Sequence, residues 1–238
     1  MNLRVWQLSK AFGSQWALQD ISFDLHGGDC VALLGQNGAG KTTLLKLLSA
    51  LIQPTSGAIE IDDVNLAQAS ARVRALVGYF VPSAHFYEHL TVKENLRLFV
   101  ALYSMHNNGT DLDDALDRVG LLHWRDRFVS ALSAGMKCRL VLAKWLLVQP
   151  AFLLLDEPYG PLDGAGVDLL ESFVSSLAQR NKAVIIATHQ IPRALALCSR
   201  ALVLNQGRLV FDGERHEAAL NLDRLVGSLL PRGKQWNS

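Results

Sequence analysis

The segment Gly-Gln-Asn-Gly-Ala-Gly-Lys-Thr-Thr at residues 35–43 constrains the fold more than any other part of the chain. It fits the phosphate-binding pattern G-x-x-x-x-G-K-[ST]. Glycines tolerate positive φ, so such a loop can wrap tightly and point its amide groups at phosphate oxygens. In this pattern Lys41 reaches the β- and γ-phosphates and Thr42 holds Mg²⁺. The plainer alternative is a glycine-rich turn before a buried helix.

The flanks of this segment favour the phosphate-binding interpretation. Residues 30–34 form a short apolar run typical of a strand. Five leucines then follow at helical spacing: Leu44, Leu45, Leu47, Leu48 and Leu51. A strand, a glycine-rich loop and a helix in this order are what the mechanism needs, because the helix start adds its positive end to the site.

Composition excludes several classes of protein. Half of the 238 residues are hydrophobic, and 23 basic against 22 acidic residues leave a net charge of +1, which argues against a dedicated nucleic-acid binder. Cys30, Cys138 and Cys198 form no C-x-x-C pair, so free thiols in a reducing compartment are expected. No uncharged apolar run approaches the ~20 residues of a membrane helix, and no signal peptide is visible, so a cytosolic location is expected.

The chain changes its pattern along its length. Alternating segments in residues 1–29 and at 57–64 predict a small antiparallel sheet. Residues 82–146 are mostly helical in pattern, with a loop at 107–109 and helical spacing again at 112–122. This region is predicted to be an inserted helical subdomain. One face of its first helix is apolar: Leu96, Phe99, Val100 and Tyr103.

Two later runs, at residues 152–155 and 183–187, are continuously apolar, as strands buried on both faces are. An apolar helical stripe lies between them: Leu169, Leu170, Phe173, Val174 and Leu177. The predicted fold is therefore α/β, a P-loop NTPase core with a mostly parallel sheet, an N-terminal antiparallel β-subdomain and the inserted helical subdomain.

Polar residues follow both of these strands. Asp156 and Glu157 end the first, and Thr188 and His189 end the second. Ligands of open α/β sheets bind beyond the carboxyl ends of the strands, so these side chains should meet Lys41 at one edge. There Asp156 is suited to hold Mg²⁺, Glu157 to activate a water as general base, and His189 to contact the γ-phosphate. The plainer alternatives are an acidic turn and a polar histidine at a strand end.

A further segment, Leu-Ser-Ala-Gly-Met at residues 132–136, precedes a strongly apolar helix. Ser133 is a good N-cap, and the helix start offers amide groups and a positive dipole end. The segment is either the capped start of a core helix or a second phosphate-binding surface.

Together these motifs resemble the nucleotide-binding subunit of an ABC transporter over nearly the whole chain. Residues 35–43 resemble its Walker A motif, 132–136 its signature motif, and 152–157 its Walker B motif with the catalytic glutamate. Residues 160–163 resemble its D-loop, and His189 its switch histidine. The resemblance implies ATP contacts at Phe12, Gly35, Gln36, Asn37, Gly38, Ala39, Gly40, Lys41, Thr42, Thr43, Ser133, Gly135 and Asp163.

The resemblance also implies an activity and partners. ATP and Mg²⁺ would bind between the P-loop of one subunit and the signature of a second. The implied assembly is a homodimer that drives transmembrane permease subunits from the cytoplasmic face of the inner (plasma) membrane. Thr42 and Asp156 would hold the metal, and no nucleic acid is expected as a partner. The implied division is a nucleotide core at about 1–81 and 147–230, the helical subdomain at 82–146, and a tail at 231–238.

The sequence departs from the family pattern in three places. The family usually has a glutamine after Gly-Tyr-x-Pro, whereas Ser83 and His85 are the polar residues present here. Ala134 and Met136 replace signature residues, and this form, with the single-domain length, resembles exporters of drugs, polysaccharides or haem. Trp16 is a second candidate for stacking on adenine.

Two alternative functions stay open at this level. One is a soluble ABC protein that acts as a mechanical switch on a ribosome or DNA, although such relatives carry paired domains or long coiled coils, which this chain lacks. The other is a regulatory subunit that binds ATP with little turnover, which the missing glutamine permits and Glu157 and His189 argue against.

Overall fold

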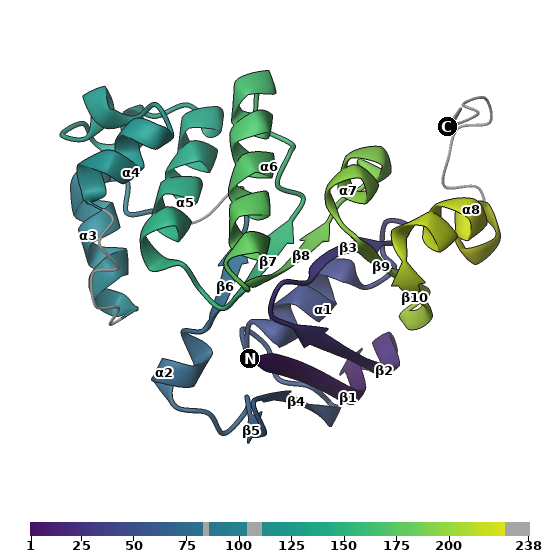
Figure 1. Cartoon of the computed structure of the whole chain (residues 1–238). Coiled ribbons are helices and arrows are strands. Elements are labelled where there is room, and N and C mark those ends of the chain that lie inside the picture. The colour runs from purple at the N-terminus through teal and green to yellow at the C-terminus, as the bar shows by residue number, and fades with distance from the viewer. Residues whose placement is uncertain (83–85, 104–110, 227–238) are drawn as a thin grey trace.

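A computed structural model describes residues 1–82, 86–103 and 111–226 of the chain. Two sheets form the body of the molecule (Figure 1). The first is antiparallel, in the order β2 (Gln15–His26), β1 (Asn2–Phe12), β4 (Ser56–Ile61) and β5 (Val64–Asn65). The predicted positions Ser83 and His85, the loop at 107–109 and the tail at 231–238 lie outside the described residues.

The second sheet has six strands, and it carries the phosphate-binding segment. Its order is β10 (Arg208–Glu214), β9 (Arg200–Asn205), β3 (Cys30–Leu34), β8 (Ala183–Ala187), β7 (Phe152–Asp156) and β6 (Val77–Phe80). All neighbouring pairs are parallel except β9 with β10. The predicted fold class is therefore confirmed: a mostly parallel α/β core beside an N-terminal antiparallel sheet.

The central strands are apolar throughout because each of their faces is covered. Along β3, Val31 and Leu33 join the core shared with the antiparallel sheet, whereas Ala32 and Leu34 join the core shared with the helical region. Successive side chains of a strand point to opposite faces, so a strand between two cores has no position for a polar residue.

Helix α1 (Lys41–Leu48) lies between the two sheets, where its leucines are buried (Figure 1). The helix ends before Leu51, which was expected on its apolar face. Ser49 caps the helix and Ala50 has a φ of 55°, so the chain leaves the helical path and Leu51 is 62% exposed.

Helices α3 (Val92–Leu102), α4 (Leu112–Arg118) and α5 (Ala134–Val148) stand together at one end of the six-stranded sheet (Figure 1). Their group contains two short 3₁₀ turns, at Leu122–Trp124 and Val129–Ala131. The helical spacing at residues 112–122 overestimates the length of α4, which ends at Arg118. Gly120 adopts a φ of 69°, so the chain leaves the helical path there.

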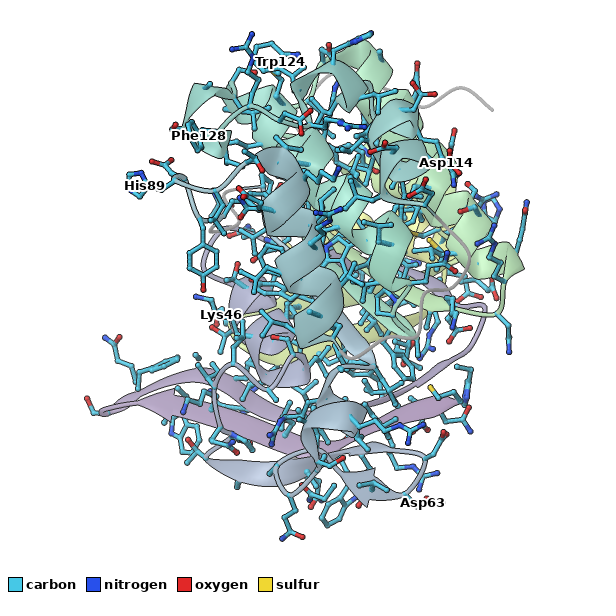
Figure 2. The ribbon with its side chains drawn as sticks, turned by 90° about the vertical axis from the view of Figure 1, so that its left-hand side faces the viewer. Lys46, Asp63, His89, Asp114, Trp124 and Phe128 are labelled. Atoms are coloured by element: carbon cyan, nitrogen blue, oxygen red, sulfur yellow. The ribbon has the colours of Figure 1, made fainter. Side chains whose placement is uncertain are left out.

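Three of the remaining four helices that the structure describes connect strands, and the last one, α8, follows the final strand β10. They are α2 (Ala71–Arg74), α6 (Gly164–Gln179), α7 (Ile191–Leu197) and α8 (Arg215–Val226). In Figure 2, Trp124 and Phe128 mark the outer edge of the helical region, and Asp63 marks the opposite end, on the turn between β4 and β5. Within the described ranges, no helix is long and apolar enough to cross a membrane.

The three cysteines are free thiols, as expected, and the structure buries all three. Two of them are nonetheless neighbours in space, although 168 positions separate them: the sulfurs of Cys30 and Cys198 lie 3.1 Å apart. Cys30 begins β3, and Cys198 ends α7, from which β9 returns beside β3. The sheet order therefore creates a contact that sequence spacing does not indicate.

Candidate active site

The phosphate-binding loop joins the end of β3 to the start of α1. Three of its glycines have positive φ: Gly35 at 151°, Gly38 at 80° and Gly40 at 106°. A Cβ on Gly40 would lie 2.6 Å from Leu18 Cδ2 and 2.8 Å from the Ala17 carbonyl oxygen, so the position is closed to larger residues. No side chain caps the start of α1, which leaves its first amide groups available to an anion.

Lys41 is nearly enclosed by this loop, with 8% of its surface exposed. Its Nζ donates to the carbonyl oxygens of Gly35, at 2.7 Å, and Gln36, at 3.1 Å. Burial lowers the pKa of Lys41, and the nearby Glu157 and Asp156 carboxylates oppose that shift. The loop thus holds a partly desolvated ammonium group, and charge interactions are stronger where water is excluded.

Asp156 ends β7 and contacts two other elements. Its Oδ1 accepts a hydrogen bond from Thr42 Oγ1 at 3.2 Å, and its Oδ2 accepts one from the hydroxyl of Tyr79 at 2.8 Å. Burial, and then the hydrogen bond to Asp156, raise the pKa of Tyr79. Tyr79 was not among the residues predicted from the sequence, because its place beside Asp156 depends on the pairing of β6 with β7.

Glu157 follows Asp156 with a φ of 47°, a left-handed conformation that a glutamate rarely adopts. Its Oε2 accepts three hydrogen bonds: from His189 Nδ1 at 2.8 Å, from Thr188 Oγ1 at 3.1 Å and from the His189 amide at 3.3 Å. The side chain is 39% exposed, so water can reach it. An oriented carboxylate with access to water is the arrangement that general-base catalysis requires.

These groups surround one pocket of about 370 Å³. The residues that line it are Ala17, Asn37, Gly38, Gly40, Lys41, Thr42, Thr43, Asp156 and Glu157. The predicted meeting of the Walker A segment with the ends of β7 and β8 is therefore present in the structure, with His189 attached through Glu157. Among the other predicted loop residues, the carbonyl oxygen of Gln36 accepts a hydrogen bond from Lys41. Gly35 and Ala39 are buried within the loop.

The predicted signature segment lies elsewhere. Ser133 caps α5, accepting a hydrogen bond from the Met136 amide at 3.2 Å, and its own surface is exposed. A Cβ on Gly135 would lie 3.1 Å from the Pro161 carbonyl oxygen, so this turn packs against the predicted D-loop. Neither Ser133 nor Gly135 belongs to the described lining of the Lys41 pocket.

Asp163 also lies with the signature helix and not in the pocket. It caps α6 by accepting from the Gly166 amide at 2.9 Å, and both its oxygens accept from Arg139 Nη2, at 2.6 and 2.8 Å. The Arg139 contact, followed by the Gly166 amide, lowers the pKa of Asp163. Arg139 is on α5, so this ion pair ties the signature helix to the D-loop.

The two aromatic candidates for adenine stacking stand at the tip of the β1–β2 hairpin. Phe12 is 54% exposed and Trp16 is 52% exposed. The Lys10 ammonium lies 5.1 Å from the centre of the Phe12 ring. Trp16 is the sequence neighbour of Ala17, which lines the pocket. Both rings are exposed, and the assignment of Phe12 to adenine stacking stays a prediction.

The oxygen atoms of Thr42 and Asp156 suit Mg²⁺, which prefers oxygen ligands and keeps several waters and substrate phosphates around it. No cluster of three or more histidine, cysteine or acidic residues suited to a metal occurs in the described part of the chain. A two-oxygen site fits a metal that arrives with a nucleotide, because the phosphates then supply further ligands.

Comparison with known proteins agrees with this geometry. Residues 18–160 match the family model described as "ABC transporter". The chain is 34% identical to the bacitracin transport ATP-binding protein BcrA of Bacillus licheniformis, over 87% of this chain and 68% of that protein. It is 33% identical to the sulfate/thiosulfate import ATP-binding protein CysA of Salmonella typhi, over 88% of this chain and 59% of that protein.

Solved structures give the same result. A structure described as the ATP binding subunit of an ABC transporter superposes with a TM-score of 0.88, at 29% identity, over 96% of this chain and 99% of that one. A dimeric ATP-binding cassette in a post-hydrolysis state, bound to ADP and Pi, superposes with a TM-score of 0.79 at 22% identity, over 90% and 98% of the two chains, which shows the shared fold.

Proposed function

This chain belongs to the ABC transporter family as an ATP-binding domain with the ATPase fold, and from that premise we propose that it powers a membrane exporter by closing and opening an ATP-dependent dimer. The observation that supports this most is the pocket itself. One cavity gathers the Lys41 ammonium, the Thr42–Asp156 pair and Glu157, and His189 contacts that glutamate.

Each group has a proposed task in hydrolysis. The Walker A amides and Lys41 bind the triphosphate, whose charge they offset. Thr42 and Asp156 would hold Mg²⁺, which would supply positive charge beside the phosphate oxygens. Glu157 accepts a proton from the attacking water, and His189 orients Glu157 and contacts the γ-phosphate.

A second ATP-binding subunit, in our proposal an identical copy, completes the site. Ser133 and the start of α5 are exposed and lie outside the Lys41 pocket, so within one chain their amides have no triphosphate to meet. A facing copy would bring this exposed helix start over the ATP of its partner. The resulting closure is a rigid-body motion that permease subunits at the cytoplasmic face of the membrane can convert into transport.

The experiment for this proposal is Glu157→Gln. Amide for carboxylate keeps the size of the side chain and removes its capacity to accept a proton, so hydrolysis should fall by about 100-fold or more. ATP affinity should stay within about twofold, and size-exclusion chromatography with ATP and Mg²⁺ should show a stable dimer. Turnover at the wild-type rate would show that Glu157 is not the general base. A chain that stays monomeric with ATP would contradict the ATP-dependent dimer.

The membrane partner is tested separately. The tagged chain, purified from detergent-solubilised membranes of its source cells, should carry integral membrane chains with it. Reconstitution of that complex in vesicles would then give the direction of transport. This measurement is needed because one of the relatives named above serves an importer. Co-purification of ribosomes or DNA in place of membrane chains would contradict the proposal.

A further inference from the structure

Tyr79 reaches Asp156, a residue that lines the pocket, because of the register of two parallel strands. It pairs with Leu154 across β6 and β7, and Asp156 follows two residues after Leu154 on the same face. Two residues of a parallel strand advance by about 6.6 Å, a distance that a tyrosine ring can span. The Tyr79 hydroxyl thus arrives at Asp156 Oδ2, at 2.8 Å.

Both oxygens of the Asp156 carboxylate are consequently held by separate elements. Thr42, at the start of α1, donates to Oδ1, and Tyr79, on β6, donates to Oδ2. A carboxylate at the end of a strand can rotate about its side-chain bonds. A donor on Oδ2 restricts that rotation and leaves Oδ1 directed at Thr42.

We propose that Tyr79 is a positioning residue for the Mg²⁺ that accompanies ATP, acting by fixing the orientation of Asp156. The inference rests on the proposed function, since it concerns the metal of the same pocket. Mg²⁺ demands a nearly ideal octahedral arrangement, so its affinity is sensitive to the orientation of each ligand. Hydrogen bonds to a metal ligand commonly change metal affinity by about 10–100-fold.

The ring and the hydroxyl of Tyr79 have separable tasks. The ring is partly buried and packs against the core shared by the two sheets. The hydroxyl contacts Asp156. A phenylalanine at position 79 would keep the packing and remove the donor, so Tyr79→Phe isolates the positioning role.

The experiment measures how much Mg²⁺ tightens ATP binding. The dissociation constant of a non-hydrolysable ATP analogue is measured by calorimetry in excess EDTA and in saturating Mg²⁺, and the ratio of the two values is compared between variants. Tyr79→Phe should lower this ratio by about tenfold and leave the constant in EDTA unchanged. Tyr87→Phe is the matched control, because the Tyr87 side chain is 58% exposed and should leave both values unchanged.

A double-mutant cycle with Asp156→Asn separates positioning from a general effect on the fold. In the Asp156→Asn background, Tyr79→Phe should produce no further change in the ratio. A tenfold change that persists there, or a wild-type ratio in Tyr79→Phe alone, would overturn the inference. Failure of the wild-type chain to bind the analogue in either buffer would instead overturn the proposed function, so the two failures are distinguishable.

Discussion

The nucleotide pocket and the helical region each contain a buried lysine, and the two lysines have opposite surroundings. Lys41 is 8% exposed and Lys144, on α5, is 7% exposed. Lys41 donates to two carbonyl oxygens and lies near two carboxylates. Lys144 lies over the rings of Phe99, at 4.6 Å, and Trp145, at 4.0 Å. Within residues 1–82, 86–103 and 111–226, it has no ion pair.

Burial alone therefore does not identify a functional lysine. At Lys41 oxygen acceptors compensate the desolvation of the ammonium group, and the charge can be used against a phosphate. At Lys144 ring faces compensate it only in part, and burial lowers its pKa to about 8. The pocket lysine is therefore expected to matter for ligand binding, and the helical lysine for stability.

The largest expected effect is that of Lys41→Ala on ATP binding. The change removes the cation that faces the triphosphate, so ATP affinity should fall by about 100-fold or more, as charge-assisted hydrogen bonds are lost. Titration calorimetry measures the ATP affinity. Lys46→Ala is the matched control, because Lys46 is on the same helix with its side chain exposed, and it should keep wild-type affinity (Figure 2). Equal ATP affinities in the two variants would contradict a special role for Lys41 in phosphate binding.

The next effect is a gain in stability from Lys144→Met. Methionine fills a similar volume without a charge. The free energy of unfolding at pH 7 should rise by about 2 kcal/mol, because the ring contacts offset only part of the desolvation of the ammonium group. Urea denaturation of the nucleotide-free chain measures this change. A loss of stability would show that the ammonium group is better compensated than its described neighbours indicate.

The stability gain of Lys144→Met should also depend on pH. The pKa of Lys144 is about 8 in the folded chain, against an ordinary value of 10.5. Between these values the unfolded chain binds more protons, so wild-type stability rises with pH there. The gain from methionine should therefore be constant below pH 8 and should shrink towards pH 10.5. A gain that does not vary over this window would assign the effect to packing and not to charge.

The smallest effect should come from a lysine that is not buried. Lys137 Nζ lies 2.8 Å from Glu88 Oε1, with side-chain exposures of 29% and 58%. Surface ion pairs contribute little, because water and salt screen them. Lys137→Gln should thus shift Tm by no more than about 2 °C in calorimetry and leave ATP affinity unchanged. A larger shift would place Lys137 with the buried lysines.

Much of the site was predictable because its residues form short sequence motifs. The glycines of residues 35–40, the lysine that follows and the acidic pair after β7 are each readable where they stand. Tyr79 was not readable, since its role depends on which strand neighbours β7 and on a register of two residues. Lys144 was not readable either, because a helix pattern does not say which rings of another helix will face it.

The amino-acid sequence by itself determined the family, the alternation of strand and helix, and the chemistry of the loop at Lys41, because periodicity and backbone conformation are local properties. The tertiary structure decided which distant groups meet: Tyr79 with Asp156, Glu157 with His189, and Cys30 with Cys198. These contacts follow from strand order and register, which the whole core selects when both faces of the six-stranded sheet are buried.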